Sequence, residues 1–303
     1  MSPARLLLLT IILLLMSVSL SACGGDAFIP SGWSGFSVDQ EIVYLAYNQF
    51  VYAIRIADGS QVWRYPKEGA ERDKSFYAAP ALTGDGQLIV GGYNHQLYSL
   101  DQKDGAEKWS FAAKDRFIAS PLVTEGLIFA PNADGNLYVL DFQGNSVWTF
   151  KAGSSLWATP VTDDRCACVY LASFDHQMYS LDAKTGKLNW GPVDVGSAVV
   201  GSPALSDEGI LYVGTFGKEM VALSAKNGEI LWRVPTDGWI WAGPALAGDR
   251  LYFGDIDGNF YVLDIVARQI LKKTKPDGPI TSTPFVTQDG IYVTTESGTI
   301  YAL

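Results

Sequence analysis

The most reactive residues in this sequence are two cysteines, Cys166 and Cys168, which stand two positions apart. Such a pair can carry out thiol–disulfide exchange, and thiolates also bind zinc. The segment is predicted to be a β-strand, in which alternate side chains point to the same face. A disulfide between residues so close would be strained, so two packed thiols and a redox-active pair both remain open. Zinc is disfavoured, because no cluster of histidine and cysteine completes a coordination sphere.

Two histidines and several aspartates occupy predicted turns. His95 and His176 stand at the same place in two hairpins, YNHQLY and FDHQMY. The equivalent residues 132–136 and 255–259 read NADGN and DIDGN, half of a calcium loop without its closing glutamate. Turn formation explains all of them. No Ser-His-Asp arrangement, phosphate-binding glycine loop or distinct carboxylate pair accompanies them, so the sequence predicts no metal, no cofactor and no enzyme activity.

The elements that must position these residues repeat along the chain. A tryptophan recurs at intervals of 46, 39, 42 and 42 residues, as Trp63, Trp109, Trp148, Trp190 and Trp232. About a dozen residues upstream stands an aromatic-x-aliphatic-acidic signal, and a proline after small residues is a third marker. Each unit reads as four short strands, here named A to D, with turn residues between them. No segment outside the N-terminal signal has the sustained 3.6-residue period of a helix.

Four short strands in a repeat of this length are typical of a β-propeller blade. The sequence therefore predicts one all-β domain over residues 33–303, a seven-bladed propeller of four-stranded antiparallel blades. Residues 33–38 align with 241–246 and give the first blade an A strand, whereas the last blade stops at its C strand. We expect residues 26–30 to supply the missing D strand. Pairing of the N- and C-terminal segments would then close the ring and hide its edge strands.

The first 22 residues are predicted to be a lipoprotein signal peptide. Arg5 is followed by an apolar run over residues 6–15, which is short of the roughly 20 residues that span a membrane. Leu-Ser-Ala-Cys at residues 20–23 has the form of a lipobox, so Cys23 is the predicted lipidation site. An uncleaved membrane anchor is the alternative. Residues 23–32 would then hold the lipidated cysteine, a tether and the closing strand.

The composition excludes some classes of function. The chain of 303 residues is 48% hydrophobic and 18% charged, which is typical of a globular protein. Its formal net charge is −10 and its cations are scattered, so it is not expected to bind nucleic acid. With Cys23 lipidated, the remaining even pair of cysteines fits an oxidising compartment. We expect an exported protein that a lipid anchors to the membrane, facing the periplasm or the cell exterior.

The repeated hairpin resembles the tryptophan-docking motif of the PQQ-like β-propeller repeat family. That motif reads small-x-Asp-x-x-Thr-Gly-Lys-x-x-Trp, and residues 180–190 match it. Residues 53–63, 99–109 and 222–232 keep its spacing. The glycine suits the positive φ of a tight turn, and the tryptophan can fill the gap between neighbouring blades. The predicted docking residues are the five recurring tryptophans with Gly59, Gly105, Gly186 and Gly228.

The resemblance implies two kinds of relative. The family contains quinoprotein dehydrogenases, which bind PQQ and calcium beside a disulfide of adjacent cysteines. It also contains non-enzymatic members such as the BamB-type lipoproteins of outer-membrane protein assembly. A lipobox followed by a propeller is similar to the BamB layout, although BamB-type propellers have eight blades and this chain has room for about seven. Cys166 and Cys168 are not adjacent, which disfavours the dehydrogenases.

Aromatic and cationic side chains are predicted to gather on one face, where D–A connections and B–C hairpins emerge together. The candidate binding residues are Trp33, Arg72, Tyr77, His95, Arg116, Phe117, Trp157, His176, Trp239 and Trp241. Burial between blades and exposure as a platform are both compatible with the sequence. An exposed platform would suit protein recognition, because aromatic residues and arginine predominate at interface hot spots.

The sequence thus predicts a lipid-anchored, non-catalytic propeller that binds protein partners of the cell envelope. We expect it to act as a scaffold in envelope or outer-membrane protein assembly, as a monomer within a complex. A glycan- or small-molecule-binding propeller is the main alternative, and a PQQ-dependent oxidoreductase is the third.

Overall fold

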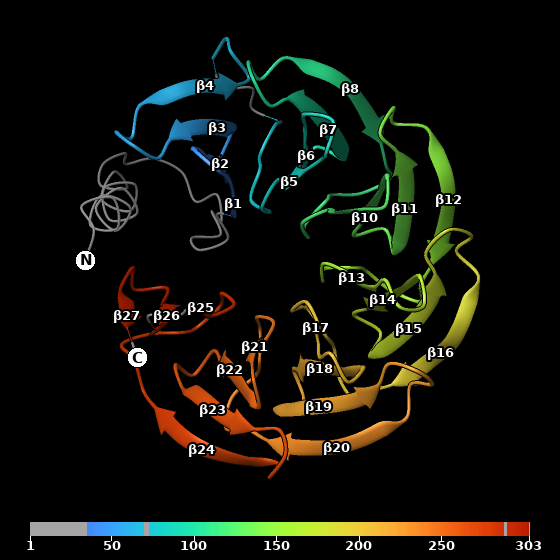
Figure 1. The fold of residues 1–303 in the computed structure, drawn as a ribbon, viewed down its shortest axis with the longest axis vertical. Coiled ribbons are helices and arrows are strands. Elements are labelled where there is room, and N and C mark those ends of the chain that lie inside the picture. Colours follow the sequence, from blue (N-terminus) through green and yellow to red (C-terminus); the bar gives the residue numbers. More distant parts are fainter. Residues whose placement is uncertain (1–34, 70–72, 288–289, 303) are drawn as a thin grey trace.

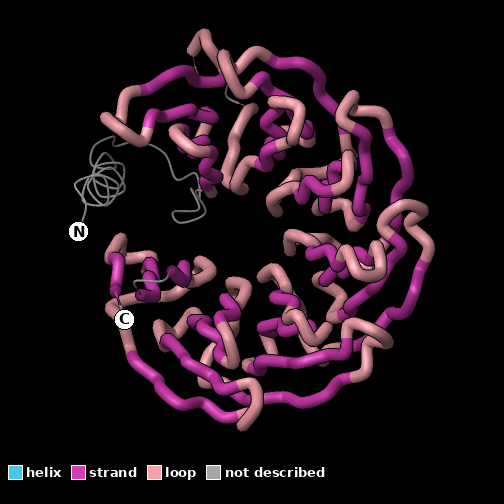
Figure 2. The backbone as a smooth tube through the Cα atoms, viewed as in Figure 1, coloured by secondary structure: helices cyan, strands magenta, loops and turns pink. Residues whose placement is uncertain are grey.

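The computed structural model describes residues 35–69, 73–287 and 290–302. Their 27 strands form seven antiparallel sheets around a central axis, and the described residues contain no helix (Figures 1 and 2). Within each sheet the strand order follows the chain order, because every strand is joined to the next by a short turn. The predicted all-β, seven-bladed propeller is confirmed.

The first four blades each have four strands. Blade 1 consists of β1 (Phe36–Asp39), β2 (Ile42–Tyr47), β3 (Phe50–Arg55) and β4 (Gln61–Tyr65), and blade 2 of β5 (Ala81–Leu82), β6 (Gln87–Gly91), β7 (Gln96–Asp101) and β8 (Glu107–Ala112). Blade 3 consists of β9 (Leu122–Thr124), β10 (Leu127–Pro131), β11 (Asn136–Asp141) and β12 (Ser146–Lys151), and blade 4 of β13 (Val161–Asp163), β14 (Cys168–Ala172), β15 (Gln177–Asp182) and β16 (Leu188–Asp194).

Blades 5 and 6 also have four strands, and blade 7 has three among the described residues. Blade 5 consists of β17 (Ala204–Leu205), β18 (Ile210–Thr215), β19 (Glu219–Ser224) and β20 (Ile230–Pro235). Blade 6 consists of β21 (Ala245–Ala247), β22 (Arg250–Gly254), β23 (Phe260–Asp264) and β24 (Gln269–Thr274). The described strands of blade 7 are β25 (Phe285–Thr287), β26 (Gly290–Thr294) and β27 (Ile300–Ala302). The predicted closing strand at residues 26–30 lies outside the described residues, as do the predicted signal peptide, Cys23, Trp33 and Arg72.

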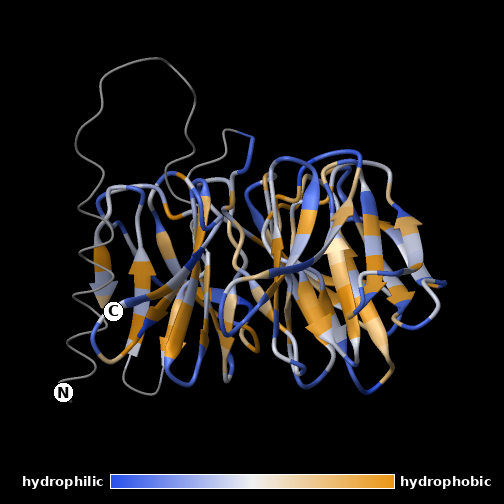
Figure 3. Cartoon of the chain, turned by 90° about the horizontal axis from the view of Figure 1, so that it is seen from above, coloured by the Kyte–Doolittle hydropathy of each residue, from blue (hydrophilic) through white to orange (hydrophobic). Residues whose placement is uncertain are grey.

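The two faces of the ring carry different connections. Because successive strands are antiparallel, the D–A connections and the B–C hairpins emerge on one face, here called the rim face. The A–B and C–D turns emerge on the opposite face, here called the turn face. Figure 3, a side view, shows hydrophilic residues concentrated in the loops at both faces and apolar residues within the strands.

The core is divided among the blade interfaces. Apolar clusters join each pair of neighbours from blades 1 and 2 through blades 6 and 7. Between blades 3 and 4, for example, Phe129 and Val139 pack with Val169 and Leu171. Inner strands such as β14 are buried on both sides, whereas the outer strand β12 alternates between exposed and half-buried residues. Each sheet therefore buries both faces only because it has neighbours, and the ring is stabilised blade by blade.

The cysteines are placed differently from the prediction. Only Cys168 lies on a strand, at the start of β14, and Cys166 lies in the A–B turn before it. Ala167 between them has φ of +50°, which breaks the extended backbone that a strand requires. The expectation that both cysteines share one strand face is therefore wrong. The two sulfurs are joined in a disulfide, so the interpretation as two packed thiols does not hold either.

Candidate functional site

The docking tryptophans connect neighbouring blades next to the turn face. Trp63 Nε1 donates a 2.9 Å hydrogen bond to the carbonyl of Gln102 in the next blade. Gly105 lies under the same ring, and a Cβ atom there would stand 2.6 Å from it. Gly105 also has φ of +70°, so both its backbone and its neighbour require glycine. This contact fixes the angle between two blades.

The same arrangement recurs around the ring. The indole nitrogens of Trp148 and Trp190 donate to the carbonyls of Ala183 and Ala225, at 3.1 and 2.8 Å. The pairs that share this geometry are Trp109 with Gly144, Trp148 with Gly186, and Trp190 with Gly228. Sequence reasoning missed Gly144, because the turn of blade 3 is one residue shorter than the motif.

The docking arrangement changes after blade 5. Trp232 packs against Tyr212 of its own blade with ring centroids 5.7 Å apart, as Trp63 does against Tyr44 and Trp190 against Tyr170. The next turn, in blade 6, has Arg268 at φ of +57° instead of a glycine. At the other end of the series, Gly59 has the φ of +72° that the motif requires.

Five aromatic side chains form a continuous group on the rim face of blades 4 to 6, here called the aromatic run: Trp157, Phe174, Phe216, Trp239 and Trp241. Trp157 contacts Phe174 at a centroid distance of 5.2 Å, and Phe174 lies 6.1 Å from Phe216. Phe216 lies 5.4 Å from Trp239 and 5.3 Å from Trp241, nearly parallel to both at 18° and 28°. The tryptophans come from D–A connections and the phenylalanines from B–C hairpins.

The aromatic run is partly accessible. Trp239 is 45% exposed, and the other four side chains are half-buried. Stacking within the run holds these rings in place without hiding them completely. The run therefore combines a fixed shape with an apolar surface that a partner could cover.

A smaller aromatic and cationic group lies on the rim face at blades 2 and 3. Tyr77 meets Tyr93 edge to face at 4.9 Å, and the Arg116 guanidinium lies 5.5 Å from the Tyr93 ring. Burial raises the pKa of Tyr93, and Arg116 acts in the opposite direction. Both tyrosines are half-buried and Arg116 is exposed. The structure thus brings the predicted rim residues together in two groups and not in one ring.

Phe117 was expected on the binding face, but it is part of the core. It is 1% exposed and packs beside Gly91 and Tyr138. Phe117 stands four residues before its A-strand proline, whereas Trp157 and Trp241 stand three before theirs. In blades 2 to 7 the residue four positions before the A-strand proline is always buried: Phe76, Phe117, Leu156, Val199, Ile240 and Ile280. The position four before the proline is therefore a core position, whereas the position three before it is buried at Ile118 and Val200 and half-buried at Trp157 and Trp241.

His95 and His176 are turn residues at the rim. Their φ angles are +67° and +72°, and both are exposed. Their backbone carbonyls accept hydrogen bonds of 2.9 Å from Ala113 and Val195. These contacts attach each B–C hairpin to the following D–A connection. The expectation that turn chemistry explains the two histidines agrees with this geometry.

Sequence reasoning missed the role of Asp255, which was assigned only to a turn. This residue is completely buried, and its carboxylate accepts four hydrogen bonds of 2.8 to 2.9 Å. The donors are the Gly238 amide, the amide and the side chain of Asn259, and the Tyr261 hydroxyl. Burial, followed by the Asp255 carboxylate, raises the pKa of Tyr261. Because Gly238 precedes Trp239, this network positions one end of the aromatic run.

The Asp255 carboxylate is therefore not arranged as a calcium ligand. Its oxygens are already held by four donors, which leaves no pair of free carboxylates in the turn. In the part of the chain that the structure describes, no group of three or more His, Cys, Asp or Glu side chains could hold a metal ion.

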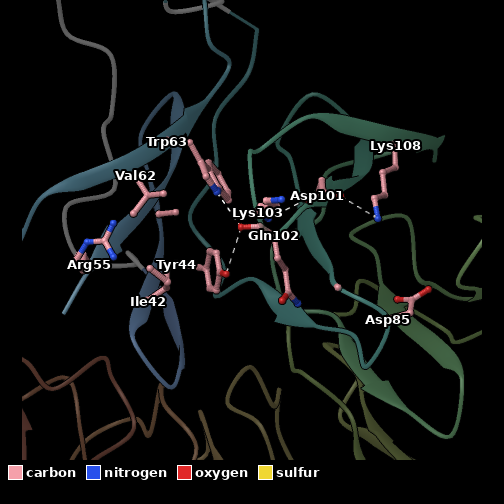
Figure 4. A pocket seen from close by; sticks show the side chains of 12 residues that line it. Ile42, Tyr44, Arg55, Val62, Trp63, Asp85, Asp101, Gln102, Lys103 and Lys108 are labelled. Carbon is pink, nitrogen blue, oxygen red and sulfur yellow. Dashed lines mark hydrogen bonds and ion pairs between the residues drawn. The ribbon is translucent and has the colours of Figure 1, made fainter. Parts of the chain in front are cut away.

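A hollow of about 520 Å³ lies on the turn face between blades 1 and 2 (Figure 4). Its carboxylates are engaged locally. Asp101 contacts Lys108 at 3.2 Å, and Asp85 accepts from Thr83 and Gln87 at 2.6 and 2.8 Å. The hollow therefore offers neither a nucleophile beside a base nor a free acid–base pair.

None of the described residues form a helix long and apolar enough to cross a membrane.

Seven blades, of which the first five are joined through tryptophan and glycine contacts, define a β-propeller of the PQQ-like repeat class. The family model described as outer membrane protein assembly factor BamB matches residues 47–191 and 175–271. The chain belongs to this family.

The similar proteins agree with that assignment. Outer membrane protein assembly factor BamB of Yersinia pestis is 23% identical over 277 residues, which cover 83% of this chain and 66% of that protein. The BamB of Moranella endobia is also 23% identical, over 84% of this chain and 67% of its own length. The chain thus spans about two thirds of the length of these relatives. A serine/threonine-protein kinase of Streptomyces griseus, AfsK, is 27% identical over 44% of this chain and 18% of its own.

Two solved structures share the fold. The crystal structure of BamB from Moraxella catarrhalis superposes with a TM-score of 0.62 and 17% identity, over 88% of this chain and 96% of that one. The computationally designed Ika8 protein superposes with a TM-score of 0.65 and 14% identity, over 91% and 98% of the two chains. At such identities the likeness concerns the fold alone.

Proposed function

We propose that this chain is a non-catalytic, lipid-anchored propeller of the cell envelope that binds protein partners during outer-membrane protein assembly. The observation that carries the proposal is the aromatic run, which presents stacked and partly exposed rings from three blades on one face of the ring. Membership of the BamB family indicates the process in which such a surface would be used.

The aromatic run has the physical properties of an interface hot spot. Trp239 and Trp241 lie on Phe216 in near-parallel stacks, so their rotamers are restricted before any partner arrives. Restriction of this kind lowers the entropy that binding would otherwise cost. Tryptophan and tyrosine contribute large contact areas and dominate the energetics of many interfaces. Apolar side chains of an extended partner segment would cover the exposed part of Trp239.

The absence of catalysis in this proposal rests on the residues that the structure describes. The buried carboxylate of Asp255 is saturated with donors, and the two histidines serve turns. The Cys166–Cys168 disulfide lies at the turn face, because it starts in an A–B turn, whereas the aromatic run is on the rim face. The disulfide and the aromatic run therefore lie on opposite faces of the ring. Lipid anchoring rests on the lipobox at residues 20–23 alone.

Affinity capture of the full lipidated protein from its native membranes tests the proposal. We expect stoichiometric recovery of outer-membrane assembly subunits, identified by mass spectrometry. Trp239→Ala should reduce recovery at least tenfold, because it removes the most exposed ring of the run. Leu231→Ala is the matched control, since Leu231 is 39% exposed on the outer strand β20, away from the run.

Two results would replace the proposal. Stacked rings also bind sugars face to face, so a glycan-binding propeller would show saturable titration with envelope glycan fragments that Trp239→Ala abolishes, with no assembly subunit captured. Stoichiometric binding of PQQ and calcium in a calorimetric titration would indicate an oxidoreductase.

A further inference from the structure

The Cys166–Cys168 disulfide joins no separate elements of the fold. Its two cysteines stand two positions apart at a single A–B turn, with only Ala167 between them. A disulfide stabilises a protein mainly by constraining the unfolded chain, and this effect grows with the length of the loop that the bond closes. A loop with one intervening residue gives little of this effect. Stability alone therefore does not account for the bond.

The two sulfurs differ in their access to solvent. Cys166 is exposed in the turn, whereas Cys168 is 8% exposed and belongs to the core cluster between blades 4 and 5. A thiolate that arrives from solvent therefore reaches the Sγ atom of Cys166. Attack on one sulfur of a disulfide releases the other as a thiolate, so Cys168 is the leaving group. Burial thus gives the bond one direction of attack.

Hydrogen-bond donors stand beside both sulfurs. The Tyr170 hydroxyl lies 3.6 Å from Cys166 Sγ, and it must be the donor because a disulfide sulfur carries no proton. Burial, followed by the charge of Asp163, raises the pKa of Tyr170 to about 12, so the hydroxyl keeps its proton at neutral pH. The side-chain amide of Asn189 donates to Cys168 Sγ at 3.6 Å. A donor at this position favours the charged form of a leaving thiolate.

The turn also offers acceptors to the reduced cysteines. Cys166 Sγ lies 3.6 Å from the carbonyl oxygen of Asp163, and Cys168 Sγ lies 3.5 Å from the carbonyl oxygen of Cys166. Neither contact is a hydrogen bond while the sulfurs are joined, because neither sulfur then carries a proton. After reduction each thiol could donate to its carbonyl. The same turn geometry therefore suits both redox states.

Contacts that do not involve sulfur hold the backbone of the turn. The carboxylate of Asp163 accepts hydrogen bonds from the amide and the guanidinium of Arg165, at 3.0 and 2.8 Å. The Ala183 amide donates to the carbonyl of Ala167 at 2.8 Å, which helps to hold Ala167 at φ of +50°. Arg165 also donates to the Ser206 carbonyl of blade 5 at 3.4 Å. Reduction removes none of these contacts, so the two thiols would stay close enough to re-form the bond.

We propose that Cys166–Cys168 is a reversible thiol–disulfide exchange site for a protein dithiol, in which Cys166 is attacked and Cys168 leaves. The partner's thiolate bonds to Cys166 Sγ while the bond between the two cysteines breaks, and Cys168 takes the electron pair and a proton from solvent. The partner's second thiolate then attacks the partner's own sulfur in this mixed disulfide and releases Cys166, which also takes up a proton. The partner is oxidised to a disulfide, and Cys166 and Cys168 are reduced by two electrons. The reverse sequence, with an oxidised partner, restores the bond.

The exchange site is separate from the surface proposed to bind proteins. The disulfide lies at the turn face and the aromatic run at the rim face, so neither depends on the other. The exchange is stoichiometric and adds no catalytic role to the aromatic run. Changes to the two cysteines leave every residue of the aromatic run in place, so the two proposals fail independently.

Reduction of the folded protein tests the exchange. The full-length lipidated protein is incubated with dithiothreitol or with reduced thioredoxin as a protein dithiol. Alkylation and mass spectrometry count the free thiols over time, while circular dichroism follows the fold. We expect complete reduction within minutes with an unchanged spectrum, an equal amount of oxidised thioredoxin, and return of the bond with oxidised glutathione. Reduction that occurs only after unfolding in guanidinium chloride would overturn the proposal.

Single-cysteine variants test the direction of attack. Cys168→Ala leaves the exposed thiol of Cys166, and Cys166→Ala leaves the buried thiol of Cys168. We expect Cys168→Ala to form a mixed disulfide with oxidised glutathione about tenfold faster or more, because access limits the reaction. Equal rates, or a faster reaction at Cys168, would overturn the assigned direction.

The parent protein answers the same question if either variant fails to fold. Its reaction with reduced glutathione is stopped in acid, and peptide mapping locates the mixed disulfide. We expect the glutathione on Cys166, with Cys168 as the free thiol. Glutathione on Cys168 would contradict the proposal, since the buried sulfur would then be the one attacked.

Discussion

The two faces of this propeller follow different rules. On the turn face one contact repeats, in which a tryptophan of one blade covers the glycine of the next turn, as with Trp63 and Gly105. On the rim face the blades differ from one another. Blades 4 to 6 carry the aromatic run, whereas blades 2 and 3 carry the Tyr77, Tyr93 and Arg116 group.

This difference separates stability from recognition. The tryptophan–glycine contact recurs at the four interfaces from blades 1 and 2 to blades 4 and 5 and joins neighbouring sheets, so it serves the ring itself. The rim groups differ from blade to blade and have no such structural reason. Trp63 is 6% exposed and Trp239 is 45% exposed, although both are tryptophans near the end of a blade. Replacing residues of the two groups should therefore affect different properties.

The largest effect is expected for Trp63→Ala. Removing this buried ring leaves a cavity against Gly105 and Tyr44 and a lost hydrogen bond, at a cost of about 3–5 kcal/mol in the free energy of unfolding. Chemical denaturation followed by circular dichroism measures the change. Trp239→Ala, which removes the same side chain from the rim, should cost less than about 1 kcal/mol. Equal losses for the two variants would show that the aromatic run is core.

Asp255→Asn should have the next largest effect. The carboxylate accepts four hydrogen bonds while fully buried, and an amide can accept at only one of its two atoms. The unsatisfied donors should cost about 2–4 kcal/mol in the free energy of unfolding. Thermal unfolding measures it, with Asp257→Asn as an exposed control in the same turn. If the two variants unfold at the same temperature, the carboxylate of Asp255 does not stabilise this part of the rim.

Phe216→Leu tests whether stacking or bulk matters in the aromatic run. Leucine keeps the apolar volume but cannot stack between Trp239 and Trp241, so both indoles should gain rotamer freedom. We expect stability to change by less than about 1.5 kcal/mol and partner recovery to fall about three- to tenfold. Quantitative capture beside the parent protein measures the second effect. Undiminished capture would mean that the run binds only through its apolar area.

Much of the fold is readable from the sequence because it repeats. The spacing of Trp63, Trp109 and Trp148 marks the blade, and the turn glycines mark its last hairpin. Gly144 was missed because one residue is absent from its turn, although the structure gives it the same place against Trp109. A motif search at fixed spacing does not tolerate such a deletion.

The rim was less predictable, because its residues are not repeated and depend on contacts across blades. Phe117 and Trp157 stand one position apart in their connections; Phe117 is in the core and Trp157 is half-buried at the rim, whereas Ile118, which is equivalent to Trp157, is buried. Asp255 resembles other turn aspartates in sequence. Its role depends on Gly238, 17 residues earlier in the chain, which only the folded ring brings near. The A–B turn at Cys166 was missed for a similar reason, since an alanine at positive φ leaves no mark in the sequence.

The smallest expected effect is an acid dependence that belongs to the repeated turns. Hydrogen bonds from Thr185, first from its side chain and then from its backbone, lower the pKa of Asp182, and equivalent turn contacts lower the pKa values of Asp101 and Asp141. A carboxylate whose folded pKa is below its unfolded value of about 3.9 stabilises the protein above that pH and loses this contribution as the pH falls through the folded pKa. We therefore expect a melting temperature that is flat between about pH 5 and 8 and declines below about pH 4.

Asp182→Asn tests whether the aspartate turns on the turn face are the source of this loss of stability in acid. Because the turn is exposed to solvent, the variant should lose less than about 1 kcal/mol at neutral pH, and its decline in acid should be shallower than that of the parent. Trp239→Ala should keep the full decline, since the aromatic run carries no titrating turn carboxylate. If Asp182→Asn left the acid limb unchanged, the repeated aspartate turns would not be the source of the acid sensitivity, and the carboxylates outside the motif would have to carry it.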